Sequence, residues 1–194
     1  MSKYLGPKLK LYKREKIDLY LKSKLIDIKK ILNNKNKSDR ISDYGNQLRE
    51  KQKLKRIYCI FERQFLNYYK KSIKKKGNTI ENLLFLLESR LDNIIYKIGI
   101  GRTILESRQF INHKFIFVNN NIVNIPSYNI NINDSITISN ENIDNIKVLL
   151  KKNKNIDNSW FSLNKDKMIF NILNIPININ KNINFNLISQ LYSK

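Results

Sequence analysis

Three cations within residues 43–58 are spaced for phosphate chemistry. Arg49, Lys53 and Arg56 recur at i, i+4 and i+7, which places them on one side of a helix. Guanidinium and ammonium groups arranged in a stripe can neutralise neighbouring phosphates of a polyanion. A merely solvated charged face is the alternative interpretation. Because few acidic residues are nearby in the sequence to pair with these cations, the pattern favours nucleic-acid binding.

A second group of polar residues surrounds the segment 103–112. Its members lie on or beside a short expected helix: Arg102, Arg108, Gln109, His113 and Lys114. Guanidinium forks suit phosphate oxygens, and a glutamine amide can add sugar or base contacts. The start of the short helix also offers free backbone amides as a phosphate seat.

Arg90 and Asp92 lie within a strongly apolar stretch, which makes them informative. One interpretation is an ion pair on a helix surface, which contributes little. The other is that Arg90 lies at the mouth of a two-helix unit and faces phosphate.

The sequence carries no catalytic constellation, and we expect no enzyme activity, cofactor or metal. A lone histidine, His113, beside basic residues is more often structural or phosphate-contacting than a general base. Residues 99–101 resemble a nucleotide loop only superficially, because the dinucleotide-binding spacing is missing. The single cysteine, Cys59, excludes a cysteine-based zinc site, and we expect it to be a small core residue within a helix.

The elements that must position these residues are mostly helices in the first half of the chain. We expect a basic extended arm and then helices at 19–32, 43–58, 62–76, 78–99 and 103–112. Asp43, Asn78 and Thr103 are the expected N-caps, the last two with a glutamate three residues later. Gly77 is expected to end the helix before it.

Short strands with asparagine-rich turns follow. The alternation predicts strands at 115–118, 122–123, 128–132 and 136–138, with a tight turn at 119–121. A helix is expected at 143–155 and a short strand at 159–163. A terminal element at 185–192 is expected to return to the first helices. The fold class is therefore α+β, a helical N-terminal domain plus a small module of two helices on a short antiparallel sheet.

Charge is the strongest compositional signal. The 194 residues include 37 Lys+Arg and 16 Asp+Glu, a net charge of +21. Residues 1–114 hold 29 of the basic and 11 of the acidic residues, a net of +18. Such an excess favours a polyanion partner, nucleic acid before an anionic membrane surface. No apolar run approaches the roughly 20 residues that span a bilayer, and we expect no membrane contact and no obligate homo-oligomer.

Several long motifs resemble one known family. They are DYGNQLREKQK at 43–53, ERQFLNYY at 62–69, GNTIENLLFLLESRLDNIIY at 77–96 and ESRQFINHK at 106–114. Val118-Asn119, Trp160 and the final four residues fit the same pattern. The chain thereby resembles the ribosomal protein S-four family of bacteria and plastids, continuously from about residue 40 to residue 138.

The resemblance implies a structural protein of the small ribosomal subunit. The family is a primary rRNA-binding protein that nucleates assembly of the 5′ domain at a multi-helix junction. It also contacts ribosomal protein S-five, contributes to translational accuracy and lies near the point where mRNA enters. Matching positions imply the following RNA contacts: Arg49, Lys53, Arg56, Arg90, Arg108, Gln109, His113 and Lys114.

Two departures from the family pattern matter. The N-terminal cysteines with which some members bind zinc are missing here, so the resemblance implies no zinc. The glycine that usually follows Val-Asn is replaced by Asn120, which should leave the turn in place at some strain.

The domain boundaries that we expect combine pattern and resemblance. Residues 1–42 form a basic arm and short helix, 43–87 a helical rRNA-binding domain, and 88–151 the RNA-binding module. Residues 152–194 form a C-terminal segment that packs back on the helical domain.

The alternative function is an RNA-modifying or tRNA-binding enzyme accessory protein, because such enzymes carry the same module beside a catalytic domain. The lack of a targeting segment and the abundance of Ile, Asn and Lys indicate an organelle-encoded protein. A plastid or reduced plastid is preferred, with a bacterial cytoplasm or mitochondrion as alternatives.

Overall fold

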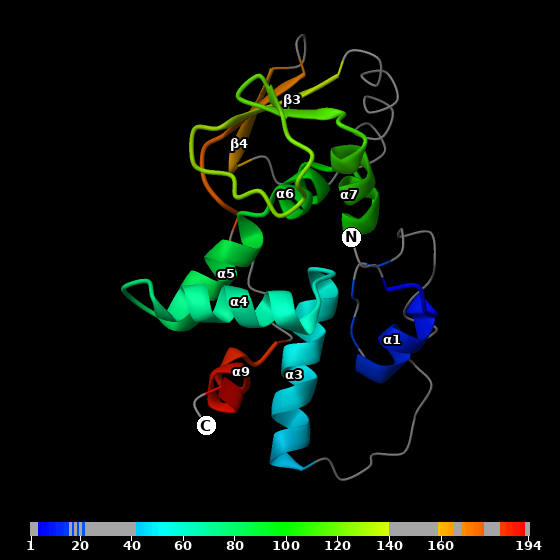
Figure 1. The fold of residues 1–194 in the computed structure, drawn as a ribbon, viewed down its shortest axis with the longest axis vertical. Helices are drawn as coiled ribbons and strands as arrows, with labels where there is room; N and C mark the ends of the chain where they lie inside the picture. The colour runs from blue at the N-terminus through cyan, green and yellow to red at the C-terminus, as the bar shows by residue number, and fades with distance from the viewer. Residues whose placement is uncertain are drawn as a thin grey trace. The chain divides into compact units, whose positions relative to one another are not determined.

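The computed structural model describes residues 4–15, 17, 19, 21, 42–139, 159–164, 168–176 and 183–192 (Figure 1). The chain divides into two compact units, residues 1–62 with 179–194 and residues 63–178. The helix expected at 143–155, and all but two residues of the helix expected at 19–32, lie outside the described residues.

The first unit contains three described helices: α1 (Lys8–Glu15), α3 (Asp43–Ile57) and α9 (Phe185–Tyr192). The expectation of an extended arm was wrong for α1. Pro7 immediately precedes this helix, and its carbonyl accepts from the Lys10 N–H at 3.2 Å in the first turn. Burial of Leu11 and Tyr12 gives α1 an apolar side. Helix α9 packs against α3, as expected for the terminal element.

The ends of α3 differ from the sequence-based expectation. Ser42, not Asp43, is the N-cap, because its backbone is extended and its hydroxyl accepts from the Gly45 N–H at 3.2 Å. Asp43 instead takes the first helical turn, where the helix dipole favours a carboxylate. Cys59 lies beyond the helix in a left-handed conformation with φ 52° and is only partly buried, so it is not a core residue.

Four helices follow: α4 (Glu62–Ile73), α5 (Thr79–Glu88), α6 (Leu91–Ile98) and α7 (Ile104–Asn112). Two expected caps are confirmed. The Asn78 side chain accepts from the Ile80 N–H at 3.0 Å, and the Thr103 hydroxyl accepts from the Glu106 N–H at 3.2 Å. The helix expected at 62–76 ends at Ile73, so Gly77, with φ 101°, lies four residues beyond it and does not end it, contrary to expectation.

The single helix expected at 78–99 is broken at residues 89–90. Arg90 is extended, with φ −66° and ψ 137°. The Leu91 N–H donates to the Tyr128 carbonyl at 2.8 Å, and the Ile130 N–H donates to the Ser89 carbonyl at 2.8 Å. Residues 126–130 thus supply hydrogen-bond partners for the backbone at the break. The apolar stripe is therefore divided between two helices, α5 and α6. The same bonds hold residues 128–130 outside the sheet, so the strand expected at 128–132 was wrong.

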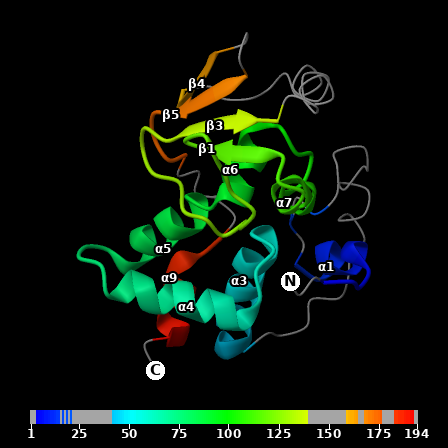
Figure 2. The ribbon, with the colours of Figure 1, turned by 45° about the horizontal axis from the view of Figure 1, so that its top comes forward.

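Five antiparallel strands form one sheet, in the order β2-β1-β3-β5-β4 (Figure 2). They are β1 (Ile116–Val118), β2 (Asn121–Ile122), β3 (Ser135–Ile138), β4 (Phe161–Asn164) and β5 (Ile169–Ile172). Asn119 and Asn120 make the β1–β2 turn with φ 50° and 65°, the conformation that a two-residue hairpin turn requires. β4 and β5 come from the segment grouped with the helical domain in the sequence analysis.

Helices α6 and α7 lie together on one face of this sheet (Figures 1 and 2). The core between them includes Ile95 and Ile98 from α6, Ile111 from α7 and Phe170 from β5, all fully buried. The α+β fold class is confirmed, with the helix pair on an antiparallel sheet. No helix in the described ranges is long and apolar enough to cross a bilayer.

Candidate nucleic-acid interface

Helix α7 presents polar side chains on its outer side. Arg102, just before the helix, is exposed, as are Gln109 and His113, which lie one turn apart. The His113 ring stacks on Phe115 with a centroid separation of 5.6 Å. The structure therefore fixes the imidazole plane at the end of α7 while leaving the residue open to a ligand.

A tight cap at the end of α7 determines where Lys114 lies. The Phe115 N–H donates to the Phe110 carbonyl at 3.1 Å, and the Lys114 N–H donates to the Ile111 carbonyl at 2.9 Å. These two bonds are those of a Schellman motif, and the Phe110 and Phe115 rings, with centroids 6.3 Å apart, make its usual apolar contact. Lys114 occupies the left-handed position, φ 62°, where glycine is preferred, and it is exposed.

Arg90 is in a buried polar cluster. Its Nε and Nη2 atoms donate to the two carboxylate oxygens of Asp92 at 3.0 and 2.8 Å. Its Nη1 atom donates to the Tyr68 hydroxyl at 2.6 Å. The exposed fraction of the Arg90 side chain is 5%. This geometry matches neither expectation, because the pair is buried rather than on the surface and the guanidinium points at protein groups.

Arg108 joins the same cluster from α7. Its Nε atom donates to Asp92 Oδ2 at 2.7 Å, so one carboxylate serves two arginines and connects α7 to α6. Burial lowers the pKa of Arg90, but the Asp92 carboxylate and the Tyr68 hydroxyl outweigh burial and raise it above its ordinary value. The Arg90 guanidinium is therefore held charged and in a fixed position.

The three cations of α3 have acidic partners, contrary to expectation. Glu15 of α1 accepts from both Arg49 and Arg56, and Glu50 pairs with Lys53 at 2.5 Å. Glu15 lies 34 residues before Arg49, so inspection of the neighbouring sequence could not reveal it. The three cations do share one helix side, as the spacing predicts.

Glu62 forms an acidic centre at the start of α4. Lys51 and Lys55 donate to its two carboxylate oxygens at 2.8 and 2.7 Å. Burial raises the pKa of Glu62, but the hydrogen bonds and charges of these lysines outweigh burial, so its pKa lies below the ordinary value. These two lysines are thus committed to an internal contact.

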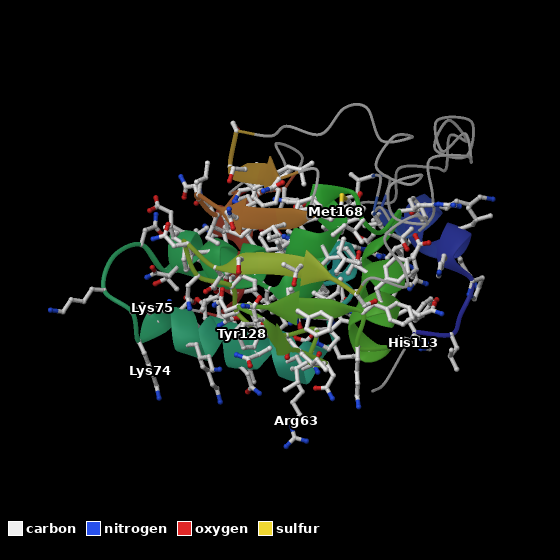
Figure 3. The ribbon with its side chains drawn as sticks, turned by 90° about the horizontal axis from the view of Figure 1, so that it is seen from above. Arg63, Lys74, Lys75, His113, Tyr128 and Met168 are labelled. Carbon is white, nitrogen blue, oxygen red and sulfur yellow. The ribbon has the colours of Figure 1, made fainter. Side chains whose placement is uncertain are left out.

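Helix α4 presents cations that are not among the candidate site residues predicted from the sequence. Six exposed basic residues lie on this helix or just after it: Arg63, Lys70, Lys71, Lys74, Lys75 and Lys76. None of them takes part in an ion pair among the described residues. Arg63 and Lys74 project outward on the same side in Figure 3. The spacing of these two residues, with Lys70 and Lys71 between them, could have indicated an RNA-binding surface. Cations at the end of a helix are also explained by the helix dipole, so the pattern alone did not require RNA.

Within the described ranges, no three His, Cys, Asp or Glu side chains are grouped to hold a metal ion. The surfaces of α4 and α7 instead offer ammonium, guanidinium, amide and imidazole groups. Such groups bind phosphate and sugar and need no bond-making chemistry. Fold and surface chemistry together define an α+β nucleic-acid-binding protein.

Comparison with known proteins gives the family. Residues 3–88 match the ribosomal protein S4/S9 N-terminal domain, and residues 89–136 match the S4 domain. The boundary between these matches falls at the break between α5 and α6. The small ribosomal subunit protein uS4 of Buchnera aphidicola (Cinara cedri, strain Cc) is 53% identical, covering 76% of this chain and 75% of the relative. That of Wigglesworthia glossinidia brevipalpis is 57% identical, covering 71% and 70%.

The chain belongs to the small ribosomal subunit protein uS4 family. It is an rRNA-binding structural protein of the ribosome and not an enzyme.

Proposed function

We propose that the chain holds a helix junction in the 5′ domain of small-subunit rRNA and nucleates assembly of that domain. The observation that carries this proposal is the concentration of exposed cations without ion-pair partners, among the described residues, on α4 and the turn after it. Phosphates crowd together where RNA helices converge, and a rigid cationic surface compensates that crowding. Shape and backbone contacts dominate this mode of binding.

The proposed contact residues fall into three groups. On α3 they are Arg49, Lys53 and Arg56. On or beside α7 they are Arg102, Arg108, Gln109, His113 and Lys114. On α4 and the turn after it they are Arg63, Lys70, Lys71, Lys74, Lys75 and Lys76. Arg90 acts indirectly, because it holds Asp92, which in turn holds Arg108.

The α4 surface gives the sharpest test of the proposed contacts. Binding of the full chain to a 5′ domain transcript is measured across salt concentrations, for the parent and a Lys70→Gln/Lys71→Gln/Lys74→Gln variant. Each lost phosphate contact lowers the slope of log affinity against log salt by about 0.7–0.9, so we expect a decrease of about 2–3. The matched control carries arginine at the same three positions and should keep the slope. An unchanged slope in the glutamine variant would refute the α4 contact.

We further propose that the protein contacts ribosomal protein S-five, lies near the point where mRNA enters and contributes to translational accuracy. Support comes from membership in the family, whose resemblance implies these roles. Misreading of a reporter codon in cells that carry variants of the chain tests the accuracy role. Cross-linking within assembled subunits tests both placements.

The abundance of Ile, Asn and Lys indicates an AT-rich genome, and we propose two origins that fit it. A plastid or reduced plastid agrees with the resemblance to the plastid members of the family. A bacterial ribosome agrees with the two relatives, both of which are bacterial. The sequence of the DNA that flanks the gene would show whether a plastid or a bacterial genome encodes the chain.

A further inference from the structure

Glu15 is a buried carboxylate that bridges two arginines. Its Oε1 atom accepts from Nη1 of Arg49 at 3.4 Å and from Nη1 of Arg56. The two arginines lie seven residues apart on α3, two helical turns along one side. Glu15 comes from α1, so two separate helices of the first unit build this cluster.

The cluster keeps a net positive charge. One carboxylate faces two guanidiniums, which leaves one unit of positive charge. The exposed fraction of the Glu15 side chain is 0%, against 43% for Arg49 and 18% for Arg56. An anion therefore cannot reach the carboxylate, whereas part of each arginine side chain, Arg49 above all, is open to it.

Helix α1 is folded so that Glu15 takes this position. Leu11 and Glu15 are one turn apart on the same side of α1, and Leu11 and Tyr12 are buried beside it. The Tyr12 hydroxyl accepts from the Leu21 N–H at 2.6 Å, which ties Leu21 to the helix. These contacts bring the carboxylate to the arginines without leaving it in water.

The carboxylate is poorly suited to a purely stabilising role. Its second oxygen, Oε2, is buried and accepts no hydrogen bond from the described residues. A buried ion pair of this kind is often no better for stability than apolar side chains of similar volume. What the carboxylate does supply is orientation, because two guanidiniums side by side would otherwise repel each other.

We propose that Glu15 is a positioning residue for RNA binding, which holds Arg49 and Arg56 as a paired clamp for the phosphate backbone of rRNA. The inference rests on the proposed role of these two arginines as RNA contacts. The opposite role would make α1 a competitor of RNA, with the Glu15 carboxylate in the place of a phosphate. The two roles predict opposite changes in RNA affinity when the Glu15 charge is removed.

The test is a Glu15→Gln variant of the full chain, measured against the 5′ domain transcript. The substitution removes one negative charge, which by charge alone strengthens binding to RNA. Positioning instead predicts binding weaker by about tenfold at moderate salt, with a salt slope lower by about 0.7–1.8 for one or two lost phosphate contacts. The matched control is Asp43→Asn, which removes an exposed negative charge from the same unit and should leave affinity unchanged or slightly higher.

A second background separates positioning from loss of structure. In an Arg49→Gln/Arg56→Gln chain, Glu15→Gln should change affinity by less than about twofold, because its effect passes through the two arginines. A tenfold loss that persists in this background would overturn the inference and indicate a folding defect. Stronger binding by Glu15→Gln in the parent chain would also overturn it and indicate competition.

The proposed contact role and the positioning role fail in different ways. If Arg49→Gln/Arg56→Gln binds RNA as well as the parent, the two arginines are not contacts and the proposed function loses its α3 surface. If that double variant binds weakly while Glu15→Gln binds normally, only the positioning role is refuted.

Discussion

Replacement of Asp92 by asparagine should destabilise the second unit more than any surface substitution in it. The Asp92 side chain is 1% exposed and receives two hydrogen bonds from Arg90 and one from Arg108. Asp92→Asn keeps the shape of the side chain but removes the negative charge to which Arg90 and Arg108 donate. Removal of one partner from a buried pair costs about 3–5 kcal/mol, since the remaining charge is uncompensated. That is a large part of the stability of a typical domain.

Urea unfolding followed by tryptophan fluorescence measures this effect. Trp160 is the single tryptophan, and it lies in the core of the second unit, edge-on to Phe161 at 4.7 Å. A loss of about 4 kcal/mol at a slope of about 2 kcal/mol per molar urea moves the midpoint down by about 2 M. The control is Glu81→Gln, which removes an exposed carboxylate from α5 and should cost less than about 1 kcal/mol.

The outcome that refutes the reasoning is a loss of less than about 1 kcal/mol for Asp92→Asn. Such a result would mean that water or movement of the arginines compensates the lost charge, so the cluster would not be the rigid connection between α6 and α7. A double variant, Asp92→Asn/Arg108→Gln, adds a second check. Because no guanidinium remains at position 108 beside the uncharged side chain, the cost of the double variant should be smaller than the sum of the two single costs.

Three further predictions follow from individual contacts. A Cβ on Gly101 would lie 2.2 Å from Ser107 Oγ and 2.9 Å from its backbone nitrogen. Gly101→Ala should therefore cost about 1–3 kcal/mol in the same urea assay, with only part of it recovered by adding Ser107→Ala. Lys114→Gly and Asn120→Gly both relieve a left-handed residue and should each stabilise by up to about 1 kcal/mol, but only Lys114→Gly should weaken RNA binding. Because the pKa of Glu62 is lowered below 4.5 in the folded chain, its contribution is present above about pH 4.5 and lost as pH falls through the folded pKa. The difference in thermal midpoint between the parent and Glu62→Gln should thus disappear in acid, and a difference independent of pH would contradict the lysine contacts.

Local features of the fold could be predicted because local residues determine them. Asn78 and Thr103 cap their helices through bonds within three residues, and paired asparagines make the hairpin turn at 119–120. The Ser42 cap was missed because a serine and an aspartate stand side by side and both suit a helix start. When two such residues are adjacent, the local pattern does not decide which of them is the N-cap, so the predicted start of the helix can be wrong by one residue.

Features set by distant contacts could not be predicted. The apolar stripe of 83–98 has helical spacing throughout, yet backbone bonds to residues 126–130 interrupt the helix at Arg90. In the same way, α1 supplies the acidic partner of Arg49 and Arg56 across a long stretch of sequence. Nothing within a helical turn of either site indicates these partners, so spacing identified the residues but not their surroundings.

The positions of the few carboxylates determine which basic residues of this chain are available to bind RNA. Glu15, Glu62 and Asp92 each accept from two basic side chains; Glu15 connects α1 to α3, and Asp92 connects α6 to α7. Charge density alone would rank Lys51, Arg90 and Lys74 as equal candidates for RNA. Their burial and partners make the first two internal, whereas Lys74 and the other α4 lysines have no acidic partner among the described residues. Because no carboxylate of the described residues competes with a phosphate for those lysines, the salt dependence of binding should respond to α4 substitutions more than to Lys51→Gln.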